Sequence, residues 1–144
     1  MSVDMSKPSK VGVLLYTGYQ ELEFWYPVLR LREAGIEAVV IGVEGAEVAS
    51  SLLGYPVVPN VPLSETSPGE YAALVLPGGR VSAVAENGPL RRFLADAARG
   101  GAILAAASQA ASLLPEGKGL VARTTDDVPQ WTRSLLNALQ RSPA

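Results

Sequence analysis

The chain has 144 residues, of which 48% are hydrophobic and 18% charged, and its formal net charge is −2. These values describe one globular domain with a sizeable core and exclude a disordered chain. The charge offers no basic surface for nucleic acid, and no apolar run approaches the length of a membrane span. Because the chain has neither cysteine nor histidine, disulfides and thiolate metal sites are excluded and no metal is expected.

Short apolar runs alternate along the chain with segments of helical periodicity, which predicts a parallel sheet covered by helices on both faces. The expected elements, in chain order, are a strand at 10–16, a helix at 21–34, strands at 36–43 and 71–76, a helix at 87–99, strands at 102–107 and 119–125, and a helix at 127–140. Residues 44–70 are rich in glycine and proline and predict a small β-hairpin or an irregular crossover.

The domain is expected to cover residues 10–141, after a disordered tail at residues 1–9. This first stretch lacks the apolar segment of a signal peptide, so a cytoplasmic location is the default expectation.

Parallel sheets bind ligands beyond the carboxyl ends of their strands. Glu23 follows the first strand, Gly78–Gly79 follows the strand at 71–76, and Ser108 follows the strand at 102–107. We therefore expect these residues to meet at one edge of the sheet.

The run ILAAASQAASLL, at residues 103–114, has the form of a nucleophile elbow. In an elbow the reactive side chain lies on a tight turn between a strand and a helix, exposed and close to backbone N–H groups. Ser108 ends the apolar strand, and the small residues Ala106 and Ala110 flank it, as such a turn requires. This pattern predicts a positive φ at Ser108, although a serine taken alone is more often structural.

Two interpretations are open for Glu23, which lies in the first turn of its predicted helix, four residues before Pro27. It is either a solvated carboxylate favoured by the helix dipole or a partly buried acid within hydrogen-bonding reach of Ser108. The pair Gly78–Gly79 permits a tight turn that presents backbone N–H groups, as an oxyanion hole requires. A Pro-Gly-Gly turn alone is common, so the prediction of a site rests on its combination with Glu23 and Ser108.

Three segments together resemble the ThiJ/PfpI superfamily: YTGYQELEFWYPVLRLREAGIEAVVIG, EYAALVLPGGR, and the stretch from Asn87 through SQAASLL. The later segment GLVARTTDDVPQWTRSLLNAL is similar to the family's last strand and closing helix. The resemblance implies the class I glutamine amidotransferase-like α/β fold, a flavodoxin-like three-layer αβα sandwich with a mainly parallel sheet. The family includes intracellular proteases, glyoxalases, deglycases, isonitrile hydratases and chaperone-like proteins.

The family's hallmarks are a Glu in the first helix shortly before a Pro, an LPGG turn, and a cysteine elbow often written A-x-C-H-G. The resemblance places Glu23 on the family's acid and Gly78–Gly79 on the turn that supplies oxyanion donors. Ser108 falls on the nucleophilic cysteine, and Gln109 falls on the position often held by histidine. An alternative alignment with the family would place Ala107 at the nucleophile position. With Ser108 at that position, however, the leucines after the elbow and the helix before it also match the family.

The family's segment between the elbow helix and the last strand is missing here, so the resemblance implies a sheet truncated after the elbow and a more open pocket. A serine hydroxyl needs a base, and a carboxylate is a poor match for its proton. We therefore predict a catalytically degenerate domain that keeps a small polar pocket for a small molecule. Arg80 and Tyr19 are further candidates for its lining, and the backbone of Gln109 is a candidate oxyanion donor.

Two alternatives remain open at this point. One is a weak serine-dependent hydrolase that uses Ser108, Glu23 and the Gly79 amide, and the other is an interaction module without a ligand site. No cofactor is expected, because the turn after the first strand lacks the Ser/Thr-rich phosphate loop that flavin mononucleotide needs. Members of the superfamily commonly self-associate, which implies a homodimer.

Overall fold

The computed structural model describes residues 9–141. Apart from Ser9, the tail expected at residues 1–9 lies outside the described residues. The described chain folds around one hydrophobic core, built from every strand of the main sheet except the shortest edge strand and from all three α-helices.

The main sheet has six strands in the order β5-β2-β1-β6-β7-β8, and every neighbouring pair is parallel. The strands are β1 (Lys10–Leu15), β2 (Ala38–Gly42), β5 (Val61–Pro62), β6 (Tyr71–Leu76), β7 (Ile103–Ala107) and β8 (Leu120–Ala122). The four longest are almost wholly buried, because helices cover both faces of a parallel sheet and each strand is a near-continuous apolar run. The predicted α/β sheet is confirmed.

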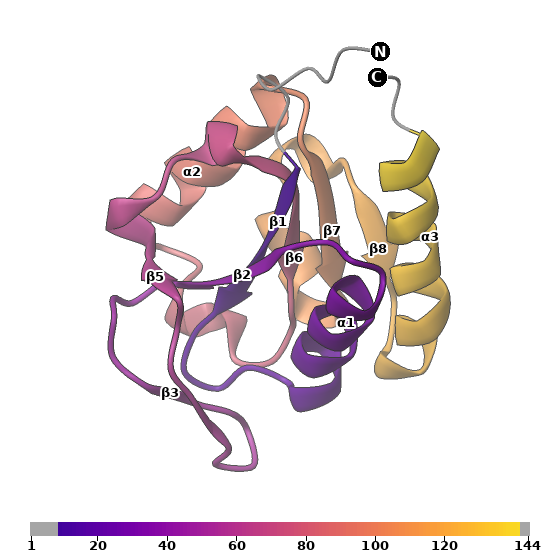
Figure 1. The fold of residues 1–144 in the computed structure, drawn as a ribbon. Helices are drawn as coiled ribbons and strands as arrows, with labels where there is room; N and C mark the ends of the chain where they lie inside the picture. The colour runs from indigo at the N-terminus through magenta and orange to yellow at the C-terminus, as the bar shows by residue number, and fades with distance from the viewer. Residues whose placement is uncertain (1–8, 142–144) are drawn as a thin grey trace.

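Three α-helices complete the sandwich: α1 (Glu21–Glu33), α2 (Gly88–Arg99) and α3 (Val128–Arg141). Figure 1 shows α1 and α3 on one side of the sheet and α2 on the other, which is the flavodoxin-like arrangement of three layers. Side-chain caps fix where two of the helices begin. The Gln20 side chain accepts from the Glu23 amide, and the Asn87 side chain accepts from the Leu90 amide.

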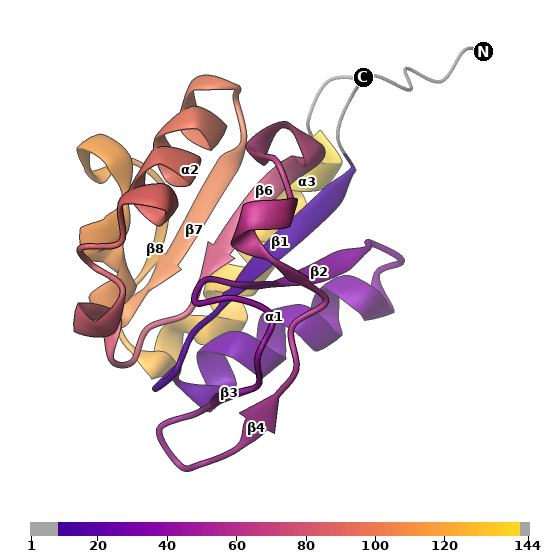
Figure 2. The same ribbon diagram turned by 90° about the vertical axis from the view of Figure 1, so that its left-hand side faces the viewer.

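The crossover between β2 and β6 contains the hairpin that the glycine and proline content predicts. Strands β3 (Ala49–Ser50) and β4 (Pro56–Val57) pair antiparallel, outside the main sheet, and protrude below it in Figure 2. The 3₁₀ turns Leu63–Glu65 and Pro68–Glu70 then lead into β6. The Gly18 amide donates to the Ser50 carbonyl at 2.7 Å, which ties the hairpin to the turn after β1.

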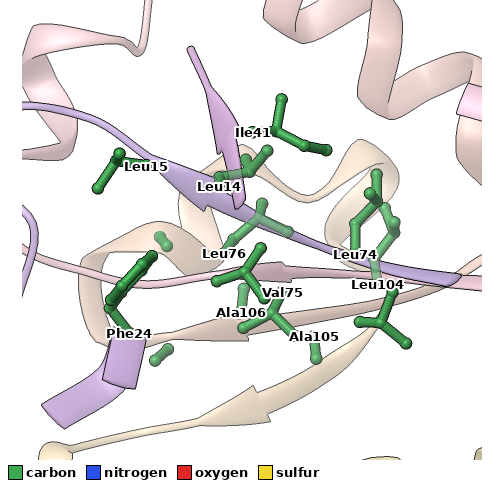
Figure 3. Close-up of a cluster of buried hydrophobic side chains, with 14 of the residues drawn as sticks. Leu14, Leu15, Phe24, Ile41, Leu74, Val75, Leu76, Leu104, Ala105 and Ala106 are labelled. Carbon is green, nitrogen blue, oxygen red and sulfur yellow. The ribbon is translucent and has the colours of Figure 1, made fainter. Parts of the chain in front are cut away.

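Large aliphatic side chains fill the core between β1, β2 and β6, whereas alanines dominate β7 (Figure 3). Leu14, Ile41 and Leu74 are at most 1% exposed. Ala105 and Ala106 are fully buried as well. Because alanine occupies little volume, the chain after β7 can turn sharply against the neighbouring elements.

The connection from β7 to β8 has no α-helix. Residues 108–119 form the 3₁₀ helix Ser108–Leu113 and the 3₁₀ turn Pro115–Gly117, and β8 follows at once. The strand expected at 119–125 is therefore shorter than predicted. Strand β8 is the last of the sheet and pairs only with β7. On its other side the Trp131 indole N–H, from α3, donates to the Leu120 carbonyl at 3.1 Å.

Candidate functional site

Backbone hydrogen bonds join the turn after β1 to the turn after β6. The Gln20 amide donates to the Gly78 carbonyl at 2.9 Å, and the Arg80 amide donates to the Gly18 carbonyl at 3.0 Å. Tyr19 and Gly79 form an isolated antiparallel bridge between these bonds. The two turns therefore form one rigid unit, and the first turn of α1 is held beside the glycine pair.

Glu23 is the centre of the candidate site. Its side chain is 1% exposed, so the interpretation as a solvated helix-start carboxylate is wrong. Oε1 accepts from the Gly78 amide at 2.8 Å, and Oε2 accepts from the Ser108 hydroxyl at 2.7 Å. The Thr125 hydroxyl also donates to Oε2, at 2.8 Å. Three donors thus replace the water that a buried carboxylate has lost.

Ser108 has the backbone geometry that a nucleophile elbow requires. Its φ is 51°, in the left-handed region, whereas Ala107 before it is extended with a φ of −111°. This confirms the register with Ser108 at the turn and not Ala107. A non-glycine residue held in this region costs on the order of 1–3 kcal/mol, which the surrounding contacts must offset. The half-buried Ser108 side chain points at Glu23 from the carboxyl end of β7.

The two glycine amides expected to serve as oxyanion donors are both occupied. The Gly78 amide is buried against Glu23, and the Gly79 amide donates to Oε1 of the Gln109 side chain at 3.2 Å. The sequence pattern could not show this, because it places the glycines in a turn without saying which side chain their N–H groups meet. An oxyanion could accept from either glycine only by displacing the side-chain oxygen that it meets here, so the role of these amides as oxyanion donors stays a prediction.

Tyr19 and Arg80, the two other residues expected to line the pocket, lie in different surroundings. Tyr19 is fully buried and its hydroxyl donates to the Tyr55 carbonyl at 3.0 Å, so its ring belongs to the core and lines no open pocket. Burial also raises the pKa of this hydroxyl above its ordinary value. Arg80 is exposed, and its side chain covers Gly18, where an added Cβ would lie 2.8 Å from the Arg80 Cβ. Arg80 therefore lies at the rim of the joined turns.

Thr125 and Tyr16 belong to the site, but no sequence pattern predicts this. Thr125 lies in the 3₁₀ turn Thr125–Asp127 after β8 and reaches Glu23 across 102 residues of sequence. Tyr16 is buried and donates its hydroxyl to the Pro77 carbonyl at 2.7 Å, which fixes the start of the glycine turn. Burial, and to a lesser degree the charge of Glu23, raise the pKa of Tyr16 far above its usual range. Both residues lie in segments that resemble the family, but nothing in those segments signals which side chain or carbonyl their hydroxyls meet.

Residues 9–141 contain neither a metal-binding cluster nor a membrane-spanning helix. No group of three or more acidic, histidine or cysteine side chains there is arranged to hold a metal ion. No helix in the same span combines the length and apolar character that crossing a membrane requires.

Comparison with known proteins places these features in a family. The sequence model of the DJ-1/PfpI family matches residues 9–141. The deglycase TK1284 of Thermococcus kodakarensis is 38% identical over 71 residues, which span 49% of this chain and 42% of that protein. Protein dj-1beta of Drosophila melanogaster is 27% identical over 127 residues, spanning 87% of this chain and 68% of that protein. The match to the deglycase thus covers less than half of that relative's length.

Solved structures share the fold at low sequence identity. The crystal structure of Drosophila melanogaster DJ-1beta superposes with a TM-score of 0.83 and 20% identity, covering 92% of this chain and 90% of that one. A two-domain protein from Anabaena variabilis, with DJ-1/ThiJ/PfpI-like and ferritin-like domains, gives a TM-score of 0.84 over 94% of this chain and 51% of that one, at 20% identity. With a family match across all of the described residues and this shared fold, the chain belongs to the DJ-1/PfpI family.

Proposed function

We propose that this chain is a catalytically silent binding domain, cytoplasmic in location, which keeps the DJ-1/PfpI scaffold and a small polar site. The observation that supports this proposal is the hydrogen bond from the Ser108 hydroxyl to Glu23. In this arrangement a hydroxyl replaces the thiol expected at the nucleophile position, and the group that faces it is a carboxylate. The chain has no histidine that could shuttle the proton.

Attack by Ser108 would require its proton to move to Glu23. A carboxylic acid is a much stronger acid than a serine hydroxyl, so this transfer is strongly unfavourable. Glu23 also accepts from Gly78 and Thr125, so both of its oxygens already have hydrogen-bond donors. The Gly79 amide would have to release Gln109 before it could stabilise an oxyanion. Each of these features opposes acyl transfer.

We expect no Ser108-dependent turnover of activated esters or methylglyoxal. The wild type, Ser108→Ala and Glu23→Gln should give equal, slow rates, because a hydroxyl without a matched base gains little over water. Steady-state assays of the three proteins at equal concentration measure this directly. A wild-type kcat above roughly 1 s⁻¹ that either substitution abolishes would establish the serine-hydrolase alternative.

A second proposal concerns self-association, and an exposed apolar surface favours it. We name this surface the α1–hairpin face, and its residues are Leu22, Leu29, Leu52, Leu53 and Tyr55, which are 44%, 57%, 42%, 84% and 63% exposed. The hairpin is held to α1 because Glu21 accepts from the Ser51 hydroxyl and, at 2.8 Å, from the Leu53 amide. Large exposed apolar groups gathered on neighbouring elements are typical of protein–protein interfaces. A second copy of the chain is the partner that we propose for this face.

Light scattering coupled to size exclusion should give twice the 15.1 kDa mass of one chain. Leu53→Asp should give a single chain's mass, because the substitution would bury a charge at the centre of an apolar contact. Val121→Asp is the matched control, since Val121 is 46% exposed but lies on β8, away from this face. A wild type with the mass of one chain, or equal effects of both substitutions, would contradict the proposed dimer surface.

A further inference from the structure

The face of the sheet that carries α2 is covered less completely than the opposite face. Strand β8 packs against α3 on that opposite face (Figure 1), and the connection from β7 to β8 provides 3₁₀ turns in place of a helix. A groove of about 700 Å³ remains between the end of α2, the amino ends of β7 and β8, and the turn Pro115–Gly117. Small-molecule sites have volumes of about 300–1,000 Å³.

Apolar side chains make up most of the lining of this space, which we name the α2–β8 groove. They are Ala95, Ala98, Ala102, Ile103, Leu104 and Leu120. Ala102, Ile103 and Leu120 are half-buried and pack against the main core, so each still presents apolar surface to water. The apolar part of a ligand that covered this surface would be stabilised by the hydrophobic effect.

The wall of the groove opposite α2 is held by the backbone. The Lys118 amide donates to the Pro115 carbonyl at 3.1 Å, which closes the 3₁₀ turn. Gly119 then lies so close to β7 that an added Cβ would be 2.6 Å from the Leu104 carbonyl oxygen. The groove is therefore preformed between this turn and a regular helix, and a ligand would bind without the cost of ordering a loop.

Two cations, Arg99 and Lys118, lie among the lining residues with one carboxylate, that of Glu116. Arg99 pairs with Asp96, and the Lys118 Nζ lies 3.8 Å from Oε2 of Glu116. The side chains of the two cations are 74% and 80% exposed, and ion pairs so exposed hold their partners weakly. Both cations also have N–H donors beyond those that one carboxylate can accept. Arg99 stands in the last turn of α2, where its charge offsets the partial negative charge of the helix end.

We propose that the α2–β8 groove binds a small amphipathic anion, an aliphatic carboxylate whose chain covers the apolar lining and whose carboxylate meets Arg99 and Lys118. Ligands rich in hydroxyl groups are disfavoured, because the apolar lining offers no replacement for their bonds to water. The groove lies at the amino end of β7, whereas Ser108 follows its carboxyl end. This inference therefore goes beyond the proposed function and does not depend on it.

The charged part is tested by calorimetric titration with decanoate, kept below its micelle concentration. The double variant Arg99→Gln/Lys118→Gln should bind decanoate about three- to tenfold more weakly than the wild type. Arg92→Gln is the matched control, because Arg92 is an exposed cation of the same helix that does not line the groove, and its affinity should equal that of the wild type. Decylammonium, with the same chain and the opposite charge, should bind the wild type more weakly than decanoate. Tighter binding of decylammonium would overturn the proposal.

The apolar part is tested by Ala98→Trp. Ala98 is exposed at the groove, so a larger side chain there can fill the space without entering the core. This variant should lose decanoate binding, and nitrogen–proton correlation spectra of the wild type should show decanoate-dependent shifts at the amides of the groove. Full binding by Ala98→Trp, no measurable binding by the wild type, or shifts confined to the α1–hairpin face would each overturn the proposal. Ser108→Ala should bind decanoate like the wild type, so the result is separate from that for the silent site.

Discussion

Replacement of Gly79 by alanine is expected to lower the free energy of unfolding by at least about 3 kcal/mol. Gly79 has a φ of +118°, a conformation that residues with a side chain rarely adopt. A Cβ there would lie 2.2 Å from the Gly18 carbonyl oxygen and 2.9 Å from the Gln20 amide nitrogen. Both are backbone atoms in the joined turns, so the clash cannot be relieved by rotation of a side chain.

Urea denaturation of Gly79→Ala and Gly88→Ala gives the comparison. Gly88 begins α2, has no positive φ, and has open space around an added Cβ. Its substitution should leave stability unchanged or raise it slightly, because alanine loses less backbone entropy than glycine. A loss below about 1 kcal/mol for Gly79→Ala would contradict the tight apposition of the two turns.

The second large effect is expected for Glu23→Ala, which should lower the free energy of unfolding by about 3 kcal/mol. The substitution leaves the buried amide of Gly78 without its acceptor and removes the acceptor of two hydroxyls, those of Ser108 and Thr125. It also leaves a space in a site that is otherwise closed at this point. Thermal or urea unfolding of the purified variant measures the loss.

Glu23→Gln is the matched control, because its carbonyl keeps an acceptor for Gly78 and its volume is the same. It should lose much less stability than Glu23→Ala. The opposite outcome, in which Glu23→Ala is more stable than the wild type, would show that the buried carboxylate is maintained at the expense of stability. That result would contradict a stabilising role for Glu23 and would indicate that the carboxylate is kept for a function.

The sequence predicts the sheet well because parallel strands buried on both faces have a simple signature. Runs such as β1 and β6 are apolar at nearly every position, and at six residues each they are shorter than a typical buried helix. The turn at Ser108 is predictable for a related reason. Its small neighbours and its place after such a strand indicate a tight turn, and the φ of 51° confirms it.

What the sequence does not predict is which polar groups meet. The contact of Thr125 with Glu23 depends on how β8 and the turn after it return to the centre of the sheet. Tyr19 is adjacent to the glycine turn in the fold, yet its ring points into the core. The occupation of the Gly79 amide by Gln109 is likewise a matter of side-chain direction. Local patterns constrain the backbone but do not determine these directions.

The indole of Trp131 at the edge of the sheet has a consequence for the behaviour of the protein in concentrated solution. An uncovered edge strand invites the strand of another molecule to extend the sheet, which is a route to aggregation. Here the terminal strand has only three residues, and the Trp131 N–H already satisfies the Leu120 carbonyl. The β8 edge therefore offers few free backbone groups to a strand from another molecule. Growth of the sheet by strand addition at this edge is disfavoured.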